Sequence, residues 1–200
     1  PAACDYYKEG LRSLQERYGI DGFKFDGGDT YFYTGDIVSF DEEATPVDHL
    51  QAWSRIGLDF PFNEYRASYG LAGEPLAERL SDKNCTWDDL GKLVPDMIAA
   101  GLLGYPYACP DMIGGGELTS FSDNADIDGM MVVRSAQVHA LMPMMQFSAA
   151  PWRILSEENF RLCREAARLH VRYGGEIYRL AQVYRETGEP IVRYMRSEER

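Results

Sequence analysis

Apolar residues recur along the chain with two different spacings, one typical of helices and the other typical of strands. Tyr7, Leu11 and Leu14 recur at helical spacing, which predicts an amphipathic helix over residues 5–18. We expect further helices over residues 47–56, 87–98 (stopped by Gly101), 129–141 and 157–186 (broken at Gly174-Gly175). Short apolar runs between them predict strands at residues 23–26, 60–68, 77–81, 104–110 and 144–148.

Strand, loop and helix thus alternate, which indicates an α/β protein with a parallel sheet. In such folds the functional side chains gather where the strands end and the loops begin. Three predicted strands lead to an aspartate, namely Asp26, Asp82 and Asp111. We therefore expect these carboxylates to belong to one acidic site.

The segment Gly22-Phe-Lys-Phe-Asp-Gly-Gly-Asp29 carries the strongest signal for chemistry. Strand alternation places Phe23 and Phe25 on one face and Lys24 and Asp26 on the other. A lysine on the same face favours the ionised carboxylate, which suits a nucleophile. The alternative is a plain turn, because Asp before Gly-Gly often serves only to satisfy backbone N–H groups.

The other two acidic segments have structural alternatives of their own. Asp82 can cap the helix that begins near Trp87, although Thr86 is better placed for that role. Asp111 precedes Met-Ile-Gly-Gly-Gly and can be a turn residue. Trp87 is more simply a core residue than a sugar contact.

Composition narrows the class of protein. The 200 residues are 45% hydrophobic with a formal net charge of -12, and the basic residues form no stripe, which argues against a nucleic-acid partner. No apolar run is long enough to predict a membrane-spanning helix. The four scattered cysteines contain no C-x-x-C pair, which argues against a zinc site, and Cys109 and Cys163 read as small buried residues. The start Pro-Ala-Ala-Cys, without Met, leads us to expect an internal piece or a processed product.

Five segments, taken in chain order, resemble glycoside hydrolase family 31. Residues 22–29 resemble the nucleophile strand, and Arg79-Leu-Ser-Asp82 followed by Trp87 resembles the acid/base segment. Pro110-Asp-Met-Ile-Gly-Gly115 resembles a sugar-binding loop. The runs at 143–152 and 188–193 resemble the last barrel segments and the step into a β-domain.

The resemblance implies a retaining α-glycoside hydrolase with a carbohydrate substrate. Asp26 would be the nucleophile and Asp82 the acid/base, while substrate contacts would come from Lys24, Asp29, Arg79, Asp111 and Trp87. No metal or other cofactor is required by that mechanism. The sequences around Lys24 and Cys109 are most similar to those of the myogenesis-regulating glycosidase subgroup. This similarity favours an α-galactosidase-type activity.

The implied fold is the second half of a (β/α)8 TIM barrel, about strands 4 to 8, over residues 1–187. Residues 188–200 would then begin a β-sandwich domain. An isolated half-barrel exposes strand edges, so we expect these residues alone to be inactive.

Two rival functions fit the same residues. Lys24 inside a barrel strand could form a Schiff base, which would make the protein an aldolase. Alternatively, the barrel could bind sugar without hydrolysing it, although the presence of both Asp26 and Asp82 speaks against this. The acidic residues Asp29, Asp36, Asp41 and Glu42 could attract calcium, but they lack regular ligand spacing, so a solvated loop is the simpler interpretation.

Overall fold

The computed structural model describes residues 2–35, 37–122 and 126–195. The chain divides into two compact units, residues 1–78 and 79–200. Helices and short strands alternate along the chain, and the strand pairs of the first unit are parallel, so the expected mixed α/β class is confirmed, whereas the half-barrel stays a prediction.

The first unit contains two helices and a parallel strand pair. Its elements are α1 (Ala2–Tyr18), β1 (Phe23–Phe25), the 3-10 turns η1 (Thr30–Phe32) and η2 (Gly57–Asp59), α2 (Pro46–Ile56) and β2 (Asn63–Tyr65). Strand β1 pairs with β2 in parallel, and Tyr65 of β2 is in turn opposite Glu78. Thr45 caps α2 by accepting a hydrogen bond from the backbone of Asp48, and Pro46 occupies the first helical turn, where its missing N–H costs nothing.

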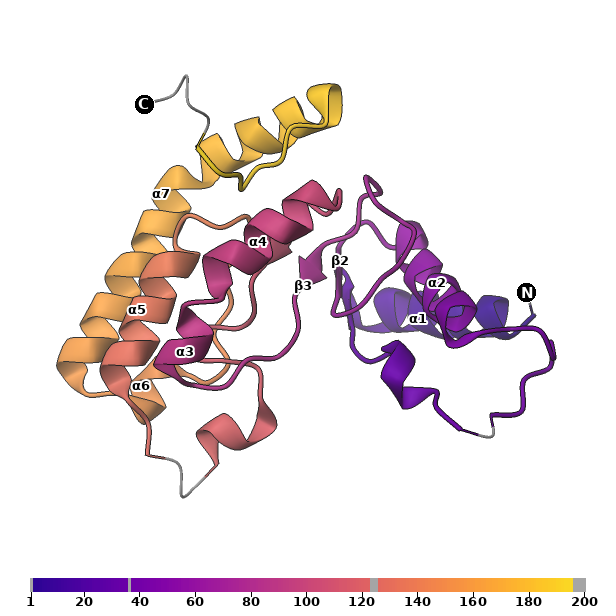
Figure 1. Cartoon of the computed structure of the whole chain (residues 1–200), viewed down its shortest axis with the longest axis horizontal. Helices are drawn as coiled ribbons and strands as arrows, with labels where there is room; N and C mark the ends of the chain where they lie inside the picture. Colours follow the sequence, from indigo (N-terminus) through magenta and orange to yellow (C-terminus); the bar gives the residue numbers. More distant parts are fainter. Residues whose placement is uncertain (1, 36, 123–125, 196–200) are drawn as a thin grey trace. The chain divides into compact units, whose positions relative to one another are not determined.

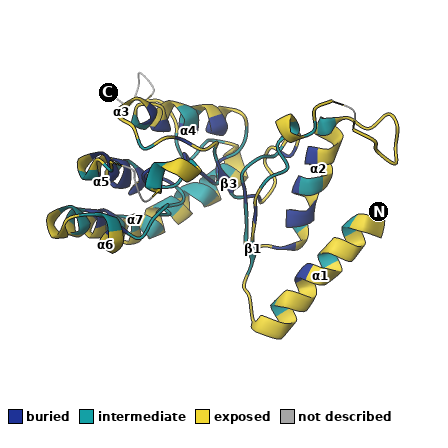
Figure 2. Cartoon of the chain, turned by 90° about the horizontal axis from the view of Figure 1, so that it is seen from below, coloured by how far each residue is buried: buried dark blue, intermediate teal, exposed yellow. Residues whose placement is uncertain are grey.

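The core of the first unit is aromatic. The rings of Phe25 and Tyr65 stack with centroids 4.8 Å apart, and Phe60 packs beside them. The buried Tyr65 hydroxyl donates to Trp53 O and accepts from Gly57 N, each at 2.9 Å, so its polar atom is satisfied. Most of α1 is exposed, with Leu11 as its buried residue (Figure 2).

The second unit is dominated by helices. After β3 (Glu78–Arg79), which lies at the unit boundary, it contains α3 (Trp87–Leu90), α4 (Leu93–Leu102), β4 (Ala108–Cys109), the 3-10 turn η3 (Leu118–Phe121), α5 (Gly129–His139), α6 (Pro151–Ile154) and α7 (Glu157–Thr187). Helix α7 runs alongside α5 (Figure 1), and α5 is largely buried (Figure 2). The buried cysteine of this core is Cys163, which is free, as is the buried Cys109.

Two predicted helix boundaries are wrong. The helix expected over 87–98 is split in two, because Pro95 has no N–H to donate to the carbonyl of Gly91 and a new helix must begin. Gly101 does not stop it, since α4 continues to Leu102. A Cβ at Gly101 would lie 2.8 Å from Pro190 Cβ, so the glycine permits close packing instead.

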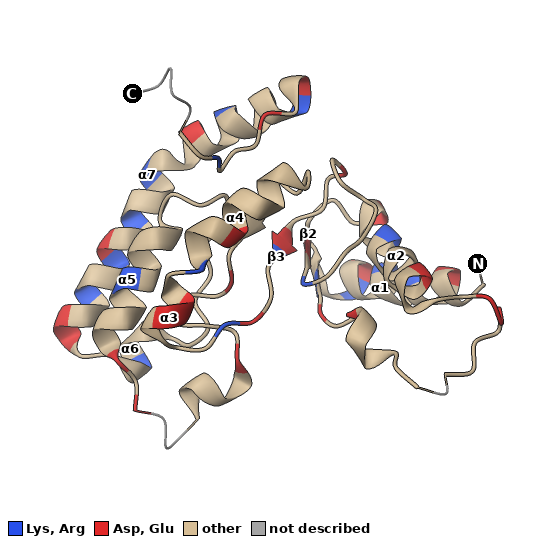
Figure 3. Cartoon of the chain, viewed as in Figure 1, with Lys and Arg blue, Asp and Glu red and all other residues tan. Residues whose placement is uncertain are grey.

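The long helix α7 is continuous through Gly174-Gly175, contrary to the predicted break. Glycine costs only about 1 kcal/mol in a helix interior, and the strong helix formers on either side maintain the hydrogen bonds. Basic and acidic residues follow one another along α7 (Figure 3), including the pairs Arg161–Glu165 and Arg179–Glu176. Such pairs support a helix by a few tenths of a kcal/mol each.

The strands are shorter than predicted. The run at 60–68 pairs only over Asn63–Tyr65, and the run at 104–110 only over Ala108–Cys109. Prolines 61, 106 and 110 flank these strands, and a proline cannot donate to a sheet ladder. The strand expected at 144–148 is reduced to one parallel bridge between Phe147 and Ile113. Residues 188–195 contain no strand, and residues 196–200 lie outside the described part, so the β-domain stays a prediction.

Candidate active site

Strand β1 ends on the first predicted carboxylate. Burial alternates as expected, since Phe25 is buried and both Lys24 and Asp26 are exposed. The Asp26 side chain is 59% exposed, whereas the Asp29 side chain is 16% exposed. Gly27 and Gly28 both adopt positive φ, 79° and 83°, which turns the chain sharply between the two acids.

Arg66 links these two acids, and the sequence-based reasoning missed it. Its Nε and Nη2 donate to Asp29 Oδ2 at 3.1 and 2.7 Å, and its Nε lies 3.5 Å from Asp26 Oδ1. The guanidinium also lies over the Phe32 ring at 5.8 Å. Arg66 directly follows Tyr65 at the end of β2, so searching strand ends for cations as well as for acids would have found it.

Lys24 has a carboxylate partner on the neighbouring strand. Its Nζ lies 3.3 Å from Oε1 of Glu64, the residue opposite it in the β1–β2 register. The surface at the end of β1 thus carries two cations, Lys24 and Arg66, beside the acids.

In the second unit, Arg79 and Asp82 form the closest predicted pair. Arg79 Nη1 lies 2.5 Å from Asp82 Oδ1, with the arginine side chain 2% exposed and the aspartate side chain 29% exposed. The arginine is fixed by its burial, and it fixes the aspartate in turn. The alternative of Asp82 as a helix cap is wrong, because Thr86 accepts the backbone hydrogen bond of α3.

Asp111 is fully buried and connects two loops. Its Oδ2 accepts hydrogen bonds from Lys83 N and Gly116 N, both at 2.7 Å, and its Oδ1 lies 3.4 Å from Arg79 Nη1. Burial raises the pKa of the Asp111 carboxyl, and the backbone donors and Arg79 oppose that rise. Since every one of these partners donates, the arrangement requires a carboxylate that accepts at both oxygens.

Gly116 provides the space beside this pair of acids. A Cβ at this position would lie 2.5 Å from Asp82 Oδ1 and 2.7 Å from Asp111 Oδ1. Neither carboxylate can move away freely, because Arg79 holds both. The third glycine of the Gly114-Gly115-Gly116 run is therefore required by the carboxylates themselves.

Trp87 lies apart from these groups in its contacts. It is 51% exposed, so the core interpretation is wrong, and its Nε1 donates to Asp128 Oδ2 at 2.8 Å. Asp128 caps α5 through the backbone N–H groups of Met130 and Met131. The hydrogen bond therefore ties α3 to the start of α5, while a sugar contact for Trp87 stays a prediction.

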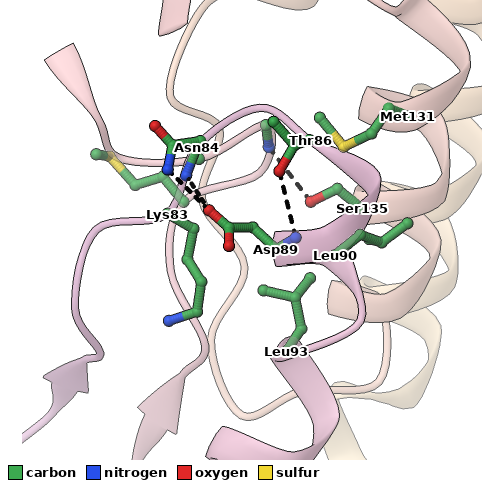
Figure 4. Close-up of a pocket in the computed structure, with 11 residues that line it drawn as sticks. Lys83, Asn84, Thr86, Asp89, Leu90, Leu93, Met131 and Ser135 are labelled. Carbon is green, nitrogen blue, oxygen red and sulfur yellow. Dashed lines mark hydrogen bonds between the residues drawn. The ribbon is translucent and has the colours of Figure 1, made fainter. Parts of the chain in front are cut away.

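A small cavity lies next to these loops, between α3, α5 and the glycine run. Its lining includes Lys83, Asn84, Asp89 and Ser135 (Figure 4), and its volume is about 10 Å³. This is room for one water molecule and not for a sugar ring. Gly114 N donates to Ser135 Oγ at 3.3 Å, so α5 supports the glycine run directly.

Within the described ranges, no cluster of three or more His, Cys, Asp or Glu could hold a metal ion, and Asp36 of the acidic run lies outside them. Among the same residues, no helix is both long enough and apolar enough to cross a membrane.

Comparison with curated proteins identifies two relatives. The chain is 31% identical over 205 residues to the myogenesis-regulating glycosidase of Mus musculus, which covers 96% of this chain and 28% of that protein. It is 27% identical over 153 residues to the SITS-binding protein of Tetronarce californica, which covers 75% of this chain and 21% of that protein. The chain thus spans under a third of the length of either relative. No family model matches the chain.

Solved structures share the fold at lower identity. A cycloalternan-degrading enzyme from Trueperella pyogenes matches 97% of this chain and 30% of its own, with a TM-score of 0.78 and 22% identity. The Kfla1895 D451A mutant matches 96% of this chain and 30% of its own, with a TM-score of 0.80 and 21% identity. The resemblance predicted from the motifs is confirmed: this chain is homologous to part of the myogenesis-regulating glycosidase and is similar to glycosidases of the family 31 type.

Proposed function

We propose that the protein is a retaining α-glycoside hydrolase in which Asp26 is the nucleophile and Asp82 the acid/base. One observation carries the proposal. Each aspartate follows the end of a strand and is held by an arginine, Arg66 or Arg79, while its own side chain stays partly exposed. This combination gives a carboxylate of fixed position that a substrate can reach. The similarity to a protein named as a glycosidase supports it.

In the proposed mechanism, an oxygen of Asp26 attacks the anomeric carbon and forms a glycosyl ester as the bond to the leaving oxygen breaks. Asp82 gives its proton to that oxygen. Asp82 then takes a proton from water, whose oxygen attacks the anomeric carbon and releases Asp26. The two inversions return the sugar in its original α configuration, with the two carboxyl groups expected roughly 5–5.5 Å apart.

Asp29, Arg66, Arg79 and Asp111 have supporting roles in this proposal. Asp29 and Arg66 hold the nucleophile and offer charge-assisted hydrogen bonds to sugar hydroxyls. Arg79 orients Asp82. Asp111 acts mainly through Arg79 and the glycine run, because its two oxygens already accept protein hydrogen bonds.

For the substrate we propose α-galactosides or related α-glycosides. The support is Lys24, which lies two residues before the nucleophile where many α-glucosidases of the family carry a tryptophan. The structural relative from Trueperella pyogenes has been solved with isomaltose, so a carbohydrate suits this fold.

The test compares Asp26→Asn and Asp82→Asn in the full-length protein on aryl α-glycosides. Asp26→Asn should abolish glycosyl-enzyme formation, while Asp82→Asn should slow substrates with poor leaving groups most, because those need protonation. Asp88→Asn, an exposed acid on α3, serves as the matched control. Normal turnover of an activated glycoside by Asp26→Asn, or a β-configured first product by NMR, would overturn the proposal.

The aldolase alternative requires a neutral Lys24. In the structure, Lys24 Nζ instead lies 3.3 Å from Oε1 of Glu64 in an ion pair. Borohydride trapping with a carbonyl substrate would separate the two, since an aldolase is labelled at Lys24 and a glycosidase is not. If the wild-type protein bound sugar but did not hydrolyse it, the second alternative, a barrel that only binds sugar, would be favoured instead.

A further inference from the structure

His139 is a buried histidine whose two ring nitrogens both face carbonyl oxygens. It is the last residue of α5 and is fully buried. Nδ1 lies 2.7 Å from Ser135 O in the same helix, and Nε2 lies 2.8 Å from Asp111 O. The second contact joins α5 to the loop that carries Asp111.

Carbonyl oxygens only accept hydrogen bonds, so both contacts of His139 need a donor on the ring. A neutral imidazole has one N–H, and its other nitrogen presents a lone pair. At these distances that lone pair would face a carbonyl oxygen in a buried site, which is repulsive. The observed geometry therefore matches the imidazolium, which donates from both nitrogens.

Charged groups around His139 act in both directions. Burial has the largest influence and lowers the pKa of His139, while its two hydrogen bonds and the Asp111 carboxylate oppose this, and the Lys83 ammonium adds to the lowering. Lys83 is itself paired with Asp96 of α4 at 3.0 Å, and Asp111 with Arg79. Because the pKa of His139 is lowered, the imidazolium that donates from both nitrogens is favoured at pH values below the ordinary histidine pKa.

A continuous series of contacts leads from His139 to the proposed acid/base. His139 holds the backbone of Asp111. The Asp111 side chain holds the backbone of Lys83 and Gly116 and lies against Arg79, which contacts Asp82. Each step is a hydrogen bond or ion pair within the second unit.

We propose that His139, as an imidazolium, is a positioning residue that fixes Asp111 and, through Arg79, the acid/base Asp82. Its effect on catalysis rests on the proposed function, whereas its protonation state does not. The loop at residues 110–116 is held from α5 when both ring nitrogens donate. When one proton is lost, one of the two contacts must open.

The first test is nitrogen NMR of the protein labelled with ¹⁵N-histidine. The chain has three histidines, so comparison with His139→Gln assigns the resonance. We expect both ring nitrogens of His139 to be protonated at acidic pH and one to lose its proton as the pH rises. A single neutral tautomer of His139 across the whole pH range in which the protein stays folded would overturn the proposal. If His139→Gln does not fold, His49→Gln and His170→Gln identify the His139 resonance as the one that neither variant removes.

The second test is the pH dependence of hydrolysis in His139→Gln, with His170→Gln as the matched control. Nδ1 of His170 lies 3.2 Å from Ala140 O, which is outside the series of contacts that leads to Asp82. We expect kcat/KM of His139→Gln to fall by about tenfold or more, which corresponds to one charge-assisted hydrogen bond, with a changed alkaline limb of kcat. His170→Gln should keep the wild-type profile.

An unchanged rate and profile in His139→Gln would refute the positioning role. If the wild-type protein hydrolysed no glycoside at all, the proposed function would fail, while the NMR result would still decide the protonation of His139.

Discussion

Arg79 Nη1 lies 2.5 Å from Oδ1 of Asp82, and this contact joins a buried cation to a carboxylate whose side chain is 29% exposed. The guanidinium cannot follow the aspartate outward, because Asp111 is its second partner. Asp82 is thus anchored from the interior of the second unit.

Arg79→Lys keeps the positive charge and removes the planar set of donors. We expect kcat/KM to fall by roughly ten- to a hundredfold, equivalent to about 1.5–3 kcal/mol for hydrogen bonds to charged groups. The loss should be greatest for poor leaving groups, which depend on Asp82. Steady-state kinetics on a series of aryl glycosides measures it, with Arg134→Lys on the exposed side of α5 as control. Equal losses for all leaving groups would disconnect Arg79 from acid catalysis.

Arg66→Lys should slow the proposed nucleophilic attack by Asp26, not the protonation of the leaving group by Asp82. Lysine cannot donate to Asp29 from two nitrogens while staying near Asp26, so formation of the glycosyl-enzyme should slow. Pre-steady-state bursts with an activated glycoside measure that step, and the exposed Arg55→Lys on α2 is the control. A normal burst combined with slow hydrolysis of the intermediate would contradict the proposed role of Arg66 in holding Asp26 as the nucleophile.

Lys24→Ala should change sugar preference as well as rate. The ammonium has three donors, and a buried polar group that the wrong epimer leaves unpaired costs about 1–3 kcal/mol. We therefore expect the preference between α-galactoside and α-glucoside to narrow. The ratio of kcat/KM for the two epimeric aryl glycosides measures it, with Lys8→Ala on α1 as control. An unchanged ratio would limit Lys24 to electrostatic support.

Glu78 should make the stability of the protein depend on pH. Burial raises its pKa to about 7, partly offset by the Ser68 hydroxyl 2.5 Å away. The folded state then holds a proton that the unfolded state has lost, so stability is highest below the unfolded pKa and falls as pH rises towards about 7. The change is of the order of 3 kcal/mol.

Urea unfolding at about pH 5 and about pH 8 would measure this effect. Glu78→Gln should remove most of the dependence, since the amide does not titrate, while the exposed Glu74→Gln should preserve it. The same slope in Glu78→Gln and in wild type would rule out Glu78 as its source.

The sequence predicted the helices and strands better than the hydrogen bonds and ion pairs between their side chains. Alternating apolar residues located β1 and the exposed position of Asp26, because a strand's faces follow from sequence alone. The burial of Asp111 could not be predicted, because it depends on hydrogen bonds from the backbone of Lys83 and Gly116. Lys83 is 28 residues away in sequence, and Gly116 is brought back to Asp111 only by the fold of the loop. Arg66 was missed for a related reason, as its partners precede it by 37 and more residues.

Glycine was the least predictable residue. Gly101 and Gly174 both read as helix terminators, yet neither ends a helix. The reason lies in packing at Gly101, where a neighbouring segment approaches closely, and in open space at Gly174, where a side chain would meet nothing. A single sequence shows that glycine can adopt many backbone conformations, but it does not show whether a neighbouring segment packs against the glycine.

The two hydrogen bonds to Asp111 have a consequence for protein engineering. They make residues 79–83 and 110–116 interdependent, because the donors lie in both segments and Gly116 leaves no room for a substitute. A chimaera that grafts only one of these segments from a homologue would bury an orphaned donor or carboxylate. Exchanging both segments together would transfer the proposed acid/base, Asp82, with the groups that hold it.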